Sequence, residues 1–445
     1  MKIDGLFDEH NSRAVDSVTT SLRFDTPLTQ RVAATGRLHA SLPKTKQGLK
    51  MRTSPPDLIV FSHLRWDFVY QRPQHLLSRA ARDRRVFFIE EPIFDCGPMH
   101  LDVAERECGV QLVVPHLPEG LESEVAREAV MQEMLNNLLR DHGISEYVLW
   151  YYTPMAMGFS RHLRPIATVY DCMDELSAFH GAPEQLTNRE QQLFARADLV
   201  FTGGQSLYEA KRSQHKAVHA FPSSIDRKHF GRARTLQLEP ADQQAIPHPR
   251  LGFFGVIDER FDCELLEAVA RVRPEWQFVL VGPVVKIDPV KLPQGKNIHY
   301  LGAKKYLDLP DYLAGWDIAL LPFARNDATR FISPTKTPEY LAAGKPVIST
   351  SIRDVVRPYG EQKFVRIADD PADFIRAVED ILSQNTSERL QWLERVDQFL
   401  SRTSWDETWA RMSAVLAEAV LTRQASVAAS VKPAMKSQAA GLVGA

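Results

Sequence analysis

The sequence predicts an α/β protein made of two Rossmann-like domains, each a doubly wound parallel sheet, that face each other across a cleft. Three observations predict this fold class. At 445 residues, the chain is too long for one ordinary hydrophobic core. Short apolar runs alternate with stretches of helical spacing, which is typical of parallel sheets covered on both faces. The alternation stops once, over residues 231–249, and then resumes.

Composition and charge narrow the class of protein. Hydrophobic residues make up 44% and charged residues 25%, as in soluble globular proteins. The formal net charge of −2 gives no electrostatic reason to expect nucleic acid as a partner. The four cysteines lie far apart and the histidines are scattered. We therefore expect no disulfide framework, no metal site and no cofactor.

The two ends of the chain are predicted to be disordered tails, residues 1–56 and 426–445. The first begins with an acidic, polar stretch unlike a signal peptide. Its residues 31–52 carry six Lys or Arg and no acid, and could touch anionic lipid at the inner face of the cell membrane; the composition favours a solvated tail. No apolar run approaches the roughly 20 residues of a membrane span. We expect a cytoplasmic protein, with peripheral contact at that membrane as the alternative.

Residues 57–230 form the first predicted domain. Its strands are short apolar runs stopped by Pro, Gly or Asp, as expected for strands buried on both faces. In chain order, the predicted strands are DLIVFS, RVFFIEEP, VQLVVPH, EYVLWYY, ATVYD and ADLVFTGG. Apolar residues at helical spacing predict three intervening helices, namely QHLLSRAARD, residues 121–141 and EQLTNREQQLFARA.

A polar segment with three prolines, residues 231–249, is predicted to be the interdomain linker. The second predicted domain, residues 250–385, repeats the alternation. Its predicted strands are RLGFFGV, WQFVLVGP, NIHYLG, DIALLPF, VIST and KFVRI, and its helices include residues 263–271 and DLPDYLAG. Residues 386–425 are predicted to be helical, since Ser404 and Glu407 form a capping box before a long amphipathic run.

The stretch FISPTKTPEYLAAGKPVIST, which begins at Phe331, lies between two predicted strands of the second domain. Ligands of open parallel sheets bind beyond the carboxyl ends of the strands, where helix N-termini point N–H groups outward. The helix is predicted to start at Ser333, or one turn later at Thr337, and to end at Gly344. Either start gathers Ser, Thr and Lys groups at the positive helix end, which predicts a phosphate site.

Lys336 and Glu339 have two interpretations. A carboxylate beside a phosphate would repel it, unless the carboxylate faces paired donors such as the two hydroxyls of a ribose. That interpretation predicts a nucleoside diphosphate as ligand. Alternatively, the two residues form an i,i+3 surface ion pair worth roughly a few tenths of a kcal/mol. When only Lys336 and Glu339 are considered, the surface ion pair is favoured over the ligand site.

Other turns of the second domain shift the balance toward a ligand site. GFFGVIDERFD places Gly255, Asp258 and Arg260 in its first strand-to-helix turn, where Arg260 could clamp a diphosphate. Gly302, in LGAKK, belongs to another tight loop at a strand end. No GxGxxG motif follows these strands and the chain has no GxxxxGK[ST] motif, which argues against nicotinamide, flavin and P-loop chemistry.

Four segments carry a family resemblance: SPTKTPEYLAAGKPVIST, FPSSIDRKHF, FFGVIDERFD and LGAKKYLDLPDYLAGWDIALLPF. They resemble the matching segments of GT-B glycosyltransferases, in particular the group 1 bacterial enzymes of surface polysaccharide assembly. WDFVYQRPQHL and VYDCMDEL resemble segments of a teichuronic-acid-type subgroup. SWDETW resembles the family's C-terminal helix, which crosses back onto the first domain. The resemblance covers about residues 57–420 and implies the GT-B fold.

The resemblance implies an enzyme of the hexosyltransferase type, which moves a sugar from a UDP- or GDP-sugar to a glycan or lipid-linked acceptor. It implies that Glu339 binds the nucleotide ribose, that Lys336 and Arg260 bind the diphosphate, and that residues 333–335 bind the distal phosphate. The implied nucleotide site contains Gly255, Asp258, Arg260, Gly302, Ser333, Thr335, Lys336 and Glu339.

The residues of the chemical step follow from the charge that develops on the departing diphosphate. Positioned cations stabilise that charge without proton transfer, so Lys336 and Arg260 are also catalytic candidates. A general base, if one is used, would lie on the facing edge of the first domain. Asp171 and Asp174 follow a predicted strand there, although helix capping or a solvated loop is the alternative for each.

Two positions depart from the family pattern. Phe331 stands where the family commonly has a second glutamate, and Tyr170 stands where many relatives have a histidine that reaches the donor sugar. The first turn of the first domain, from His63 to Leu76, is rich in aromatic residues and arginine. It could stack on a sugar acceptor, or it could be a packed aromatic core around a helix that starts at proline.

Two other functions share these features. A nucleotide-sugar epimerase has the same architecture and would release free nucleotide without an acceptor. A noncatalytic nucleotide-sugar sensor or scaffold is favoured mildly by the missing second glutamate. The presence of Arg260, Lys336 and Glu339 together favours the glycosyltransferase over the sensor.

Overall fold

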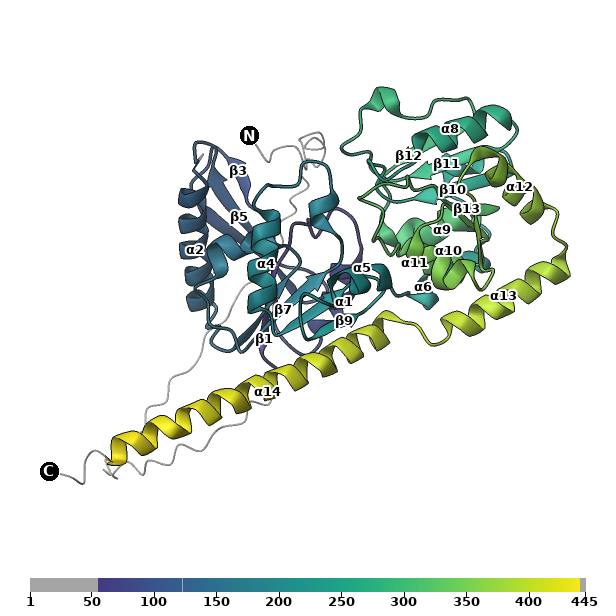
Figure 1. The fold of residues 1–445 in the computed structure, drawn as a ribbon. Helices are drawn as coiled ribbons and strands as arrows, with labels where there is room; N and C mark the ends of the chain where they lie inside the picture. The colour runs from purple at the N-terminus through teal and green to yellow at the C-terminus, as the bar shows by residue number, and fades with distance from the viewer. Residues whose placement is uncertain (1–54, 122, 441–445) are drawn as a thin grey trace, which may run out of the picture. The chain divides into compact units, whose positions relative to one another are not determined.

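The computed structural model describes residues 55–121 and 123–440, with side chains described as far as Ser426. The predicted tail over residues 1–56, with its basic segment, therefore lies almost wholly outside the described residues. Residues 55–440 contain two parallel α/β sheets, the first drawn in purple to teal and the second in green in Figure 1. This confirms the predicted fold class.

The first sheet has nine strands, in the order β3-β5-β2-β1-β6-β7-β8-β9, with β4 paired to β5. All pairs are parallel except β4 with β5, which the sequence did not predict. The strands are β1 Asp57–Phe61, β2 Val86–Ile89, β3 Ile93–Asp95, β4 His100–Glu105, β5 Val110–Pro118, β6 Tyr147–Tyr151, β7 Ala167–Cys172, β8 Leu199–Thr202 and β9 Val218–Ala220. The helices are α1 Arg72–Ala80, α2 Glu124–Asp141, α3 Met157–Ser160, α4 Leu186–Arg196 and α5 Gln205–Lys211.

The first sheet is buried on both faces, as its continuous apolar strands predict. Along β1, Leu58 and Val60 belong to one core, whereas Ile59 and Phe61 belong to the other. This alternation follows from the period of two in a strand. Both faces of the first sheet are therefore covered, and its carboxyl edge remains for a ligand.

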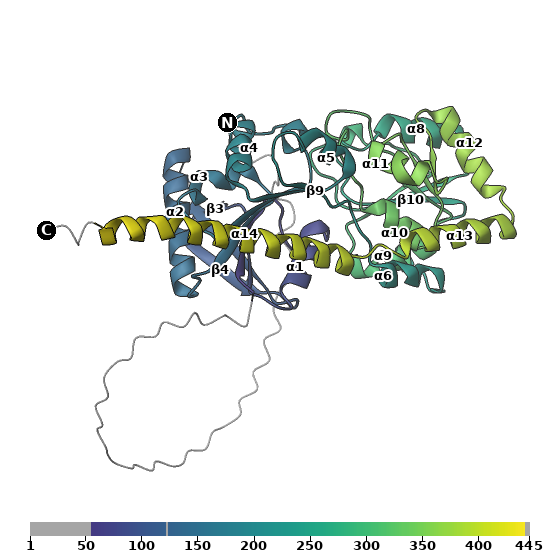
Figure 2. The same ribbon diagram turned by 60° about the horizontal axis from the view of Figure 1, so that its bottom comes forward.

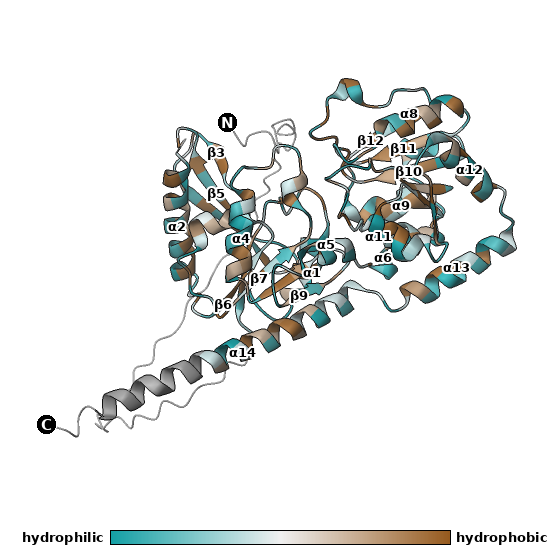
Figure 3. Ribbon diagram, viewed as in Figure 1, coloured by the Kyte–Doolittle hydropathy of each residue, from teal (hydrophilic) through white to brown (hydrophobic). Residues whose placement is uncertain are grey.

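The second sheet has six parallel strands in the order β12-β11-β10-β13-β14-β15. They are β10 Arg250–Phe254, β11 Gln277–Val281, β12 Ile298–Gly302, β13 Ile318–Leu321, β14 Val347–Ser349 and β15 Val365–Ile367. The helices around it are α6 Arg227–Gly231, α8 Cys263–Val272, α9 Leu309–Ala314, α10 Lys336–Ala342, α11 Arg353–Val355 and α12 Pro371–Leu382. Figure 3 shows the apolar colour of β10 and β11 in this sheet.

The segment predicted to be a linker, residues 231–249, differs from that expectation. It contains helix α7 Ala241–Gln244, and its Gln243 side chain is buried. Gln243 donates to the Tyr312 carbonyl at 3.0 Å and accepts from Trp316 Nε1 at 2.8 Å. The segment thus contacts the second domain through Gln243. Its anchor is a polar residue, which a search for apolar periodicity cannot detect.

The two last helices belong to different cores. Trp392 and Val396 of α13 Thr386–Leu400 lie in the core of the second sheet, whereas Trp405 and Trp409 of α14 Trp405–Ala440 lie in a core of the first. Figure 2 shows α14 running along α1. Ser404 Oγ accepts from the Glu407 N–H at 3.1 Å, so Ser404 caps the helix.

Helix α14 also continues through residues 426–440, where the sequence predicts a tail. Alanine, the strongest helix former, is frequent there, which explains the difference. None of the helices in the described residues combines the length and the apolarity that a bilayer crossing requires.

Candidate active site

Lys336 lies across the turn that follows β10. Gly255 in that turn has φ +137°, and a Cβ at this position would overlap the Cε and Nζ atoms of Lys336. Gly282, which follows β11, has φ +144°, and its Cβ would overlap the Gly255 carbonyl oxygen. Both strand ends therefore require glycine. Their backbones and the Lys336 side chain approach so closely that no space remains for a Cβ. The Lys336 ammonium also lies 5.7 Å from the centre of the Phe253 ring.

Arg260 is held by Asp258 in a fork. Its Nε donates to Asp258 Oδ1 at 2.9 Å and its Nη2 donates to Oδ2 at 2.6 Å, while its own N–H donates to Oδ1 at 3.0 Å. Burial would lower the pKa of Arg260, but the hydrogen bonds and charge of Asp258 outweigh it and raise that pKa. The guanidinium also faces the Phe179 ring of the first domain at 5.4 Å. Arg260 is thus a fixed, permanently charged group.

Glu339 is a buried carboxylate on α10, 4% exposed. No described residue donates a hydrogen bond to its carboxylate. Burial raises the pKa of Glu339, and the nearby charge of Lys336 opposes the rise. A carboxylate without a protein donor on a largely buried residue is a place for a polar ligand.

The cations and carboxylates of this site act on one another. Burial lowers the pKa of Lys336, and so does the charge of Arg260, whereas Glu339, Asp258 and Asp174 oppose that change. The structure therefore brings Lys336, Arg260 and Glu339 together around the Gly255 turn. Lys336 and Arg260 are the two groups there that could bind an anionic ligand.

The two candidate bases of the first domain differ. Asp171 is fully buried and accepts from Arg72 Nε at 3.1 Å and Nη2 at 2.9 Å, and Arg72 also donates to the Phe221 carbonyl. Its carboxylate is occupied by a structural partner. Asp174 is only partly buried. Burial raises the pKa of Asp174, and the charge of Arg260 opposes the rise, which places its carboxylate within electrostatic reach of the cationic site.

The start of α10 falls between the two predicted starts. Thr335 is the N-cap and Lys336 the first helical residue, with no side-chain capping bond. Pro338 fits because it lies in the first turn, where its missing N–H has no carbonyl to reach. Gly344 follows the helix with φ +74°, as predicted.

The remaining predicted site residues lie at the margins. The Ser333 carbonyl accepts from Ser223 Oγ of the first domain at 2.6 Å. Thr335 is partly exposed at the start of α10. Gly302 ends β12 with φ +70°, and its carbonyl accepts from the Gly282 N–H at 2.8 Å. Gly302 thus acts through its backbone.

Comparison with known proteins places one part of the chain in a family model. Residues 248–384, which contain β10 to α12 and all of Lys336, Arg260 and Glu339, match the family model of the glycosyl transferases group 1. A Bacillus subtilis (strain 168) protein, named as the teichuronic acid biosynthesis glycosyltransferase TuaH, is 26% identical over 270 residues. The match spans 56% of this chain and 66% of TuaH.

Several solved structures share the fold of this chain. Sucrose-phosphate synthase from Thermosynechococcus elongatus has a TM-score of 0.61 at 16% identity, covering 84% of this chain and 100% of its own. Anabaena Alr3699/HepE, in complex with UDP and glucose, has a TM-score of 0.59 at 12% identity, covering 82% and 100%. Their fold is GT-B.

At the two positions that depart from the pattern of the resembled family, the side chains lie in or against a core. Tyr170 is 1% exposed and donates to Glu190 at 2.7 Å. Phe331 packs against the core that contains Tyr170, and Arg330 lies over its ring. Neither residue replaces the missing polar group.

Sequence reasoning missed an aromatic stack beside Glu339. The Tyr306 ring is stacked between Tyr70 and His229, with ring centres 4.3 Å apart on each side. Burial raises the pKa of Tyr306, and the charge of Glu339 raises it further. The Tyr306 hydroxyl is buried without a partner among the described residues. These residues come from three distant segments, so no local pattern could have joined them.

The aromatic turn of the first domain is packed only in part. Trp66 is 8% exposed and contacts the edge of Phe88, and Arg65 donates to Glu90 at 2.9 Å. Phe68 and Tyr70 are each 40% exposed. Tyr70 reaches the site through its stack on Tyr306. The packed-core interpretation therefore describes Trp66 and not the other two aromatic residues.

Proposed function

We propose that this chain transfers a sugar, of the hexosyl type, from a UDP- or GDP-sugar donor to a glycan or lipid-linked acceptor in surface polysaccharide synthesis. The observation that carries the proposal is the convergence of Lys336, Arg260 and the unpaired Glu339 at the Gly255 turn. Among proteins of the same fold, HepE is known in complex with UDP and glucose, and an Escherichia coli protein is known with UDP-2-fluoro glucose.

In the proposed donor complex, Glu339 accepts hydrogen bonds from the ribose hydroxyls. Such charge-assisted bonds are about twice as strong as neutral ones. Lys336 and Arg260 bind the diphosphate, and Ser333 and Thr335 lie nearest the distal phosphate. The ligand would thereby give the Glu339 carboxylate donors and shield the two cations of the site from each other.

The same two cations would act in the chemical step. Negative charge builds on the diphosphate oxygen as its bond to the sugar breaks, and fixed positive groups in a site with little water stabilise it strongly. Asp258 keeps Arg260 in place for this role. Of the two acids of the first domain, Asp174 is the better candidate for accepting the acceptor's proton, because Asp171 is occupied by Arg72.

The name of TuaH supports a cell-surface glycan as the product, and this part of the proposal rests on that relative alone. A lipid-linked acceptor would bring the enzyme to the inner face of the cell membrane as a peripheral protein.

Calorimetry with UDP and GDP tests the donor site. Glu339→Gln keeps the size of the side chain and removes its charge, so we expect a loss of about 10- to 100-fold in affinity for one nucleotide, since hydrogen bonds to charged groups contribute about 1.5–3 kcal/mol. Glu264→Gln, on the exposed side of α8, is the matched control. Equal affinity in both variants would remove the basis of the proposal. Sugar transfer that requires an added glycan acceptor then distinguishes a transferase from an epimerase or a sensor.

A further inference from the structure

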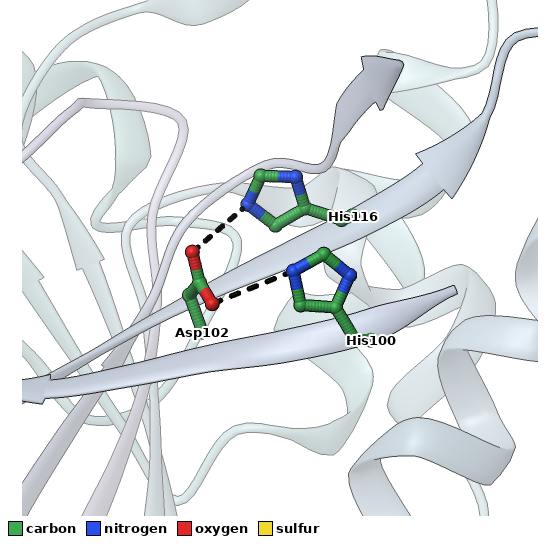
Figure 4. A group of neighbouring side chains, drawn as sticks. All are labelled: His100, Asp102 and His116. Atoms are coloured by element: carbon green, nitrogen blue, oxygen red, sulfur yellow. Dashed lines mark ion pairs between the residues drawn. The ribbon is translucent and has the colours of Figure 1, made fainter. Parts of the chain in front are cut away.

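Two histidines and an aspartate meet on the antiparallel edge of the first sheet. His100 and Asp102 lie on β4, and the register of β4 with β5 pairs His100 directly with His116. Directly paired residues share a face of the sheet, and so do residues two apart on one strand. All three side chains therefore project from the same face (Figure 4). The sequence predicted no metal spacing here, because His100 and His116 become neighbours only through this unpredicted pairing.

The three side chains present their ligand atoms to one another. His100 Nε2 lies 3.4 Å from Asp102 Oδ1, and His116 Nε2 lies 3.4 Å from Asp102 Oδ2. One ligand atom of each residue lies within 4.8 Å of the other two. Zinc bonds to His and carboxylate ligands are about 2.0–2.2 Å long, so tetrahedral ligands stand about 3.3–3.6 Å apart. At the observed distances, small rotations of the three side chains would bring their ligand atoms around one ion.

The far side of each imidazole ring is already held by a hydrogen-bond acceptor. His116 Nδ1 lies 2.6 Å from Asp95 Oδ2, and His100 Nδ1 lies 2.8 Å from the Pro98 carbonyl oxygen. The other oxygen of Asp95 accepts from the Gly97 N–H at 2.8 Å, which fixes that carboxylate. Histidines that bind metals characteristically donate their second N–H to a carboxylate or a carbonyl in this way.

These outer bonds turn both rings toward Asp102. A carbonyl or carboxylate oxygen accepts, so the Nδ1 atom of each ring is directed outward to such an oxygen. The Nε2 atom of each ring faces the Asp102 carboxylate. One cation between the three residues would contact both Nε2 atoms and the carboxylate.

We propose that His100, Asp102 and His116 bind one divalent transition-metal ion of the zinc type, with Asp95 and the Pro98 carbonyl orienting the two rings. Two imidazoles and a carboxylate suit zinc and its first-row neighbours rather than calcium or magnesium. The ion would tie the exposed strand β4 to β5. The proposal is independent of the donor site, because none of its residues belongs to that site.

The test is a metal titration of the full chain, prepared without an affinity tag and stripped with a chelator. We expect one equivalent of Zn²⁺ to bind in competition with a chromophoric chelator, and Co²⁺ at the same site to give the visible absorption of a low-coordinate ion. His116→Gln and Asp102→Asn should each weaken Zn²⁺ binding at least tenfold. Asp95→Asn should weaken it about 10- to 100-fold, the usual effect of removing an outer partner.

His180→Gln is the matched control, because His180 is an exposed histidine of the same domain outside the cluster. It should bind Zn²⁺ as the unchanged chain does. Zn²⁺ should raise the melting temperature of the unchanged chain and of His180→Gln, but not that of His116→Gln. If a ligand variant fails to fold in chelator, the exposed His100→Gln replaces it. The proposal is wrong if the unchanged chain holds no equivalent of Zn²⁺, or if the ligand variants bind it as tightly as His180→Gln does.

Discussion

At the scale of single residues, the site depends on two glycines that make room for one lysine. Gly255 and Gly282 have backbone conformations that L side chains rarely adopt, and both lie where a Cβ would overlap a neighbour. The Lys336 ammonium can reach the end of β10 only because Gly255 has no side chain. The glycine therefore determines where positive charge is presented.

Gly255→Ala should displace Lys336 and weaken nucleotide binding by at least tenfold, with a loss of roughly 1–3 kcal/mol in the free energy of unfolding from the strained backbone. Calorimetry and urea unfolding measure the two effects. Gly143→Ala is the control, since Gly143 has φ +60° but no atom within contact of a new Cβ. It should lose stability and keep nucleotide affinity. If Gly255→Ala binds nucleotide normally, Lys336 does not act from this turn.

Substitutions of Asp171, which lies in β7, and of Asp174, which follows it, should distinguish a structural role from a chemical one. Asp171→Asn leaves the buried Arg72 without its charged partner, so we expect a loss of about 3–5 kcal/mol in the free energy of unfolding. Asp174→Asn should change stability little and reduce sugar transfer by about 10²- to 10⁴-fold, the usual contribution of a general base. Denaturant unfolding and transfer rates together give the answer. If Asp174→Asn instead loses stability and Asp171→Asn instead loses sugar transfer, Asp174 is the structural residue and Asp171 the chemical one.

At the scale of elements, the contact between α1 and α14 carries a titratable group. His75 of α1 is stacked on Trp405 of α14, with ring centres 4.5 Å apart. Burial and the charge of Arg79 lower the pKa of His75 well below its usual 6.5. Its Nε2 has no partner among the described residues. His75 is therefore neutral in the folded chain.

This predicts a loss of stability in mild acid. Below pH 6.5 the unfolded chain binds a proton at His75 that the folded chain does not, so the free energy of unfolding falls as pH decreases, by up to about 1.4 kcal/mol per pH unit. His75→Phe should remove that part of the slope between pH 7 and pH 5, whereas the exposed His180→Gln should retain it. Urea unfolding across this range is the measurement. An unchanged slope in His75→Phe would show that His75 is not the group responsible.

The strands also differ in how well the sequence predicts them. β1, β6 and β10 are runs of five buried residues and were predicted because burial on both faces requires continuous apolar sequence. β4, HLDVAE, is almost wholly exposed, so hydropathy gives no sign of it. Its pairing with β5 is nevertheless what joins His100 to His116.

At the scale of the whole molecule, the sequence could predict the charged residues of the site but not the aromatic stack beside them. Arg260 lies in the segment between β10 and α8, and Lys336 and Glu339 lie in the first turn of α10, which follows β13. The carboxyl ends of parallel strands meet at one edge. The stack of Tyr70, Tyr306 and His229 joins both sheets and has no local signal. The assignment of nucleotide atoms to these residues stays a prediction.

A crystal structure of the chain with UDP or GDP tests the central claim most directly. The account predicts a Glu339 carboxylate oxygen within about 3.2 Å of a ribose hydroxyl, and Lys336 Nζ at a similar distance from a diphosphate oxygen. A nucleotide bound elsewhere, or one whose ribose faces away from Glu339, would contradict it.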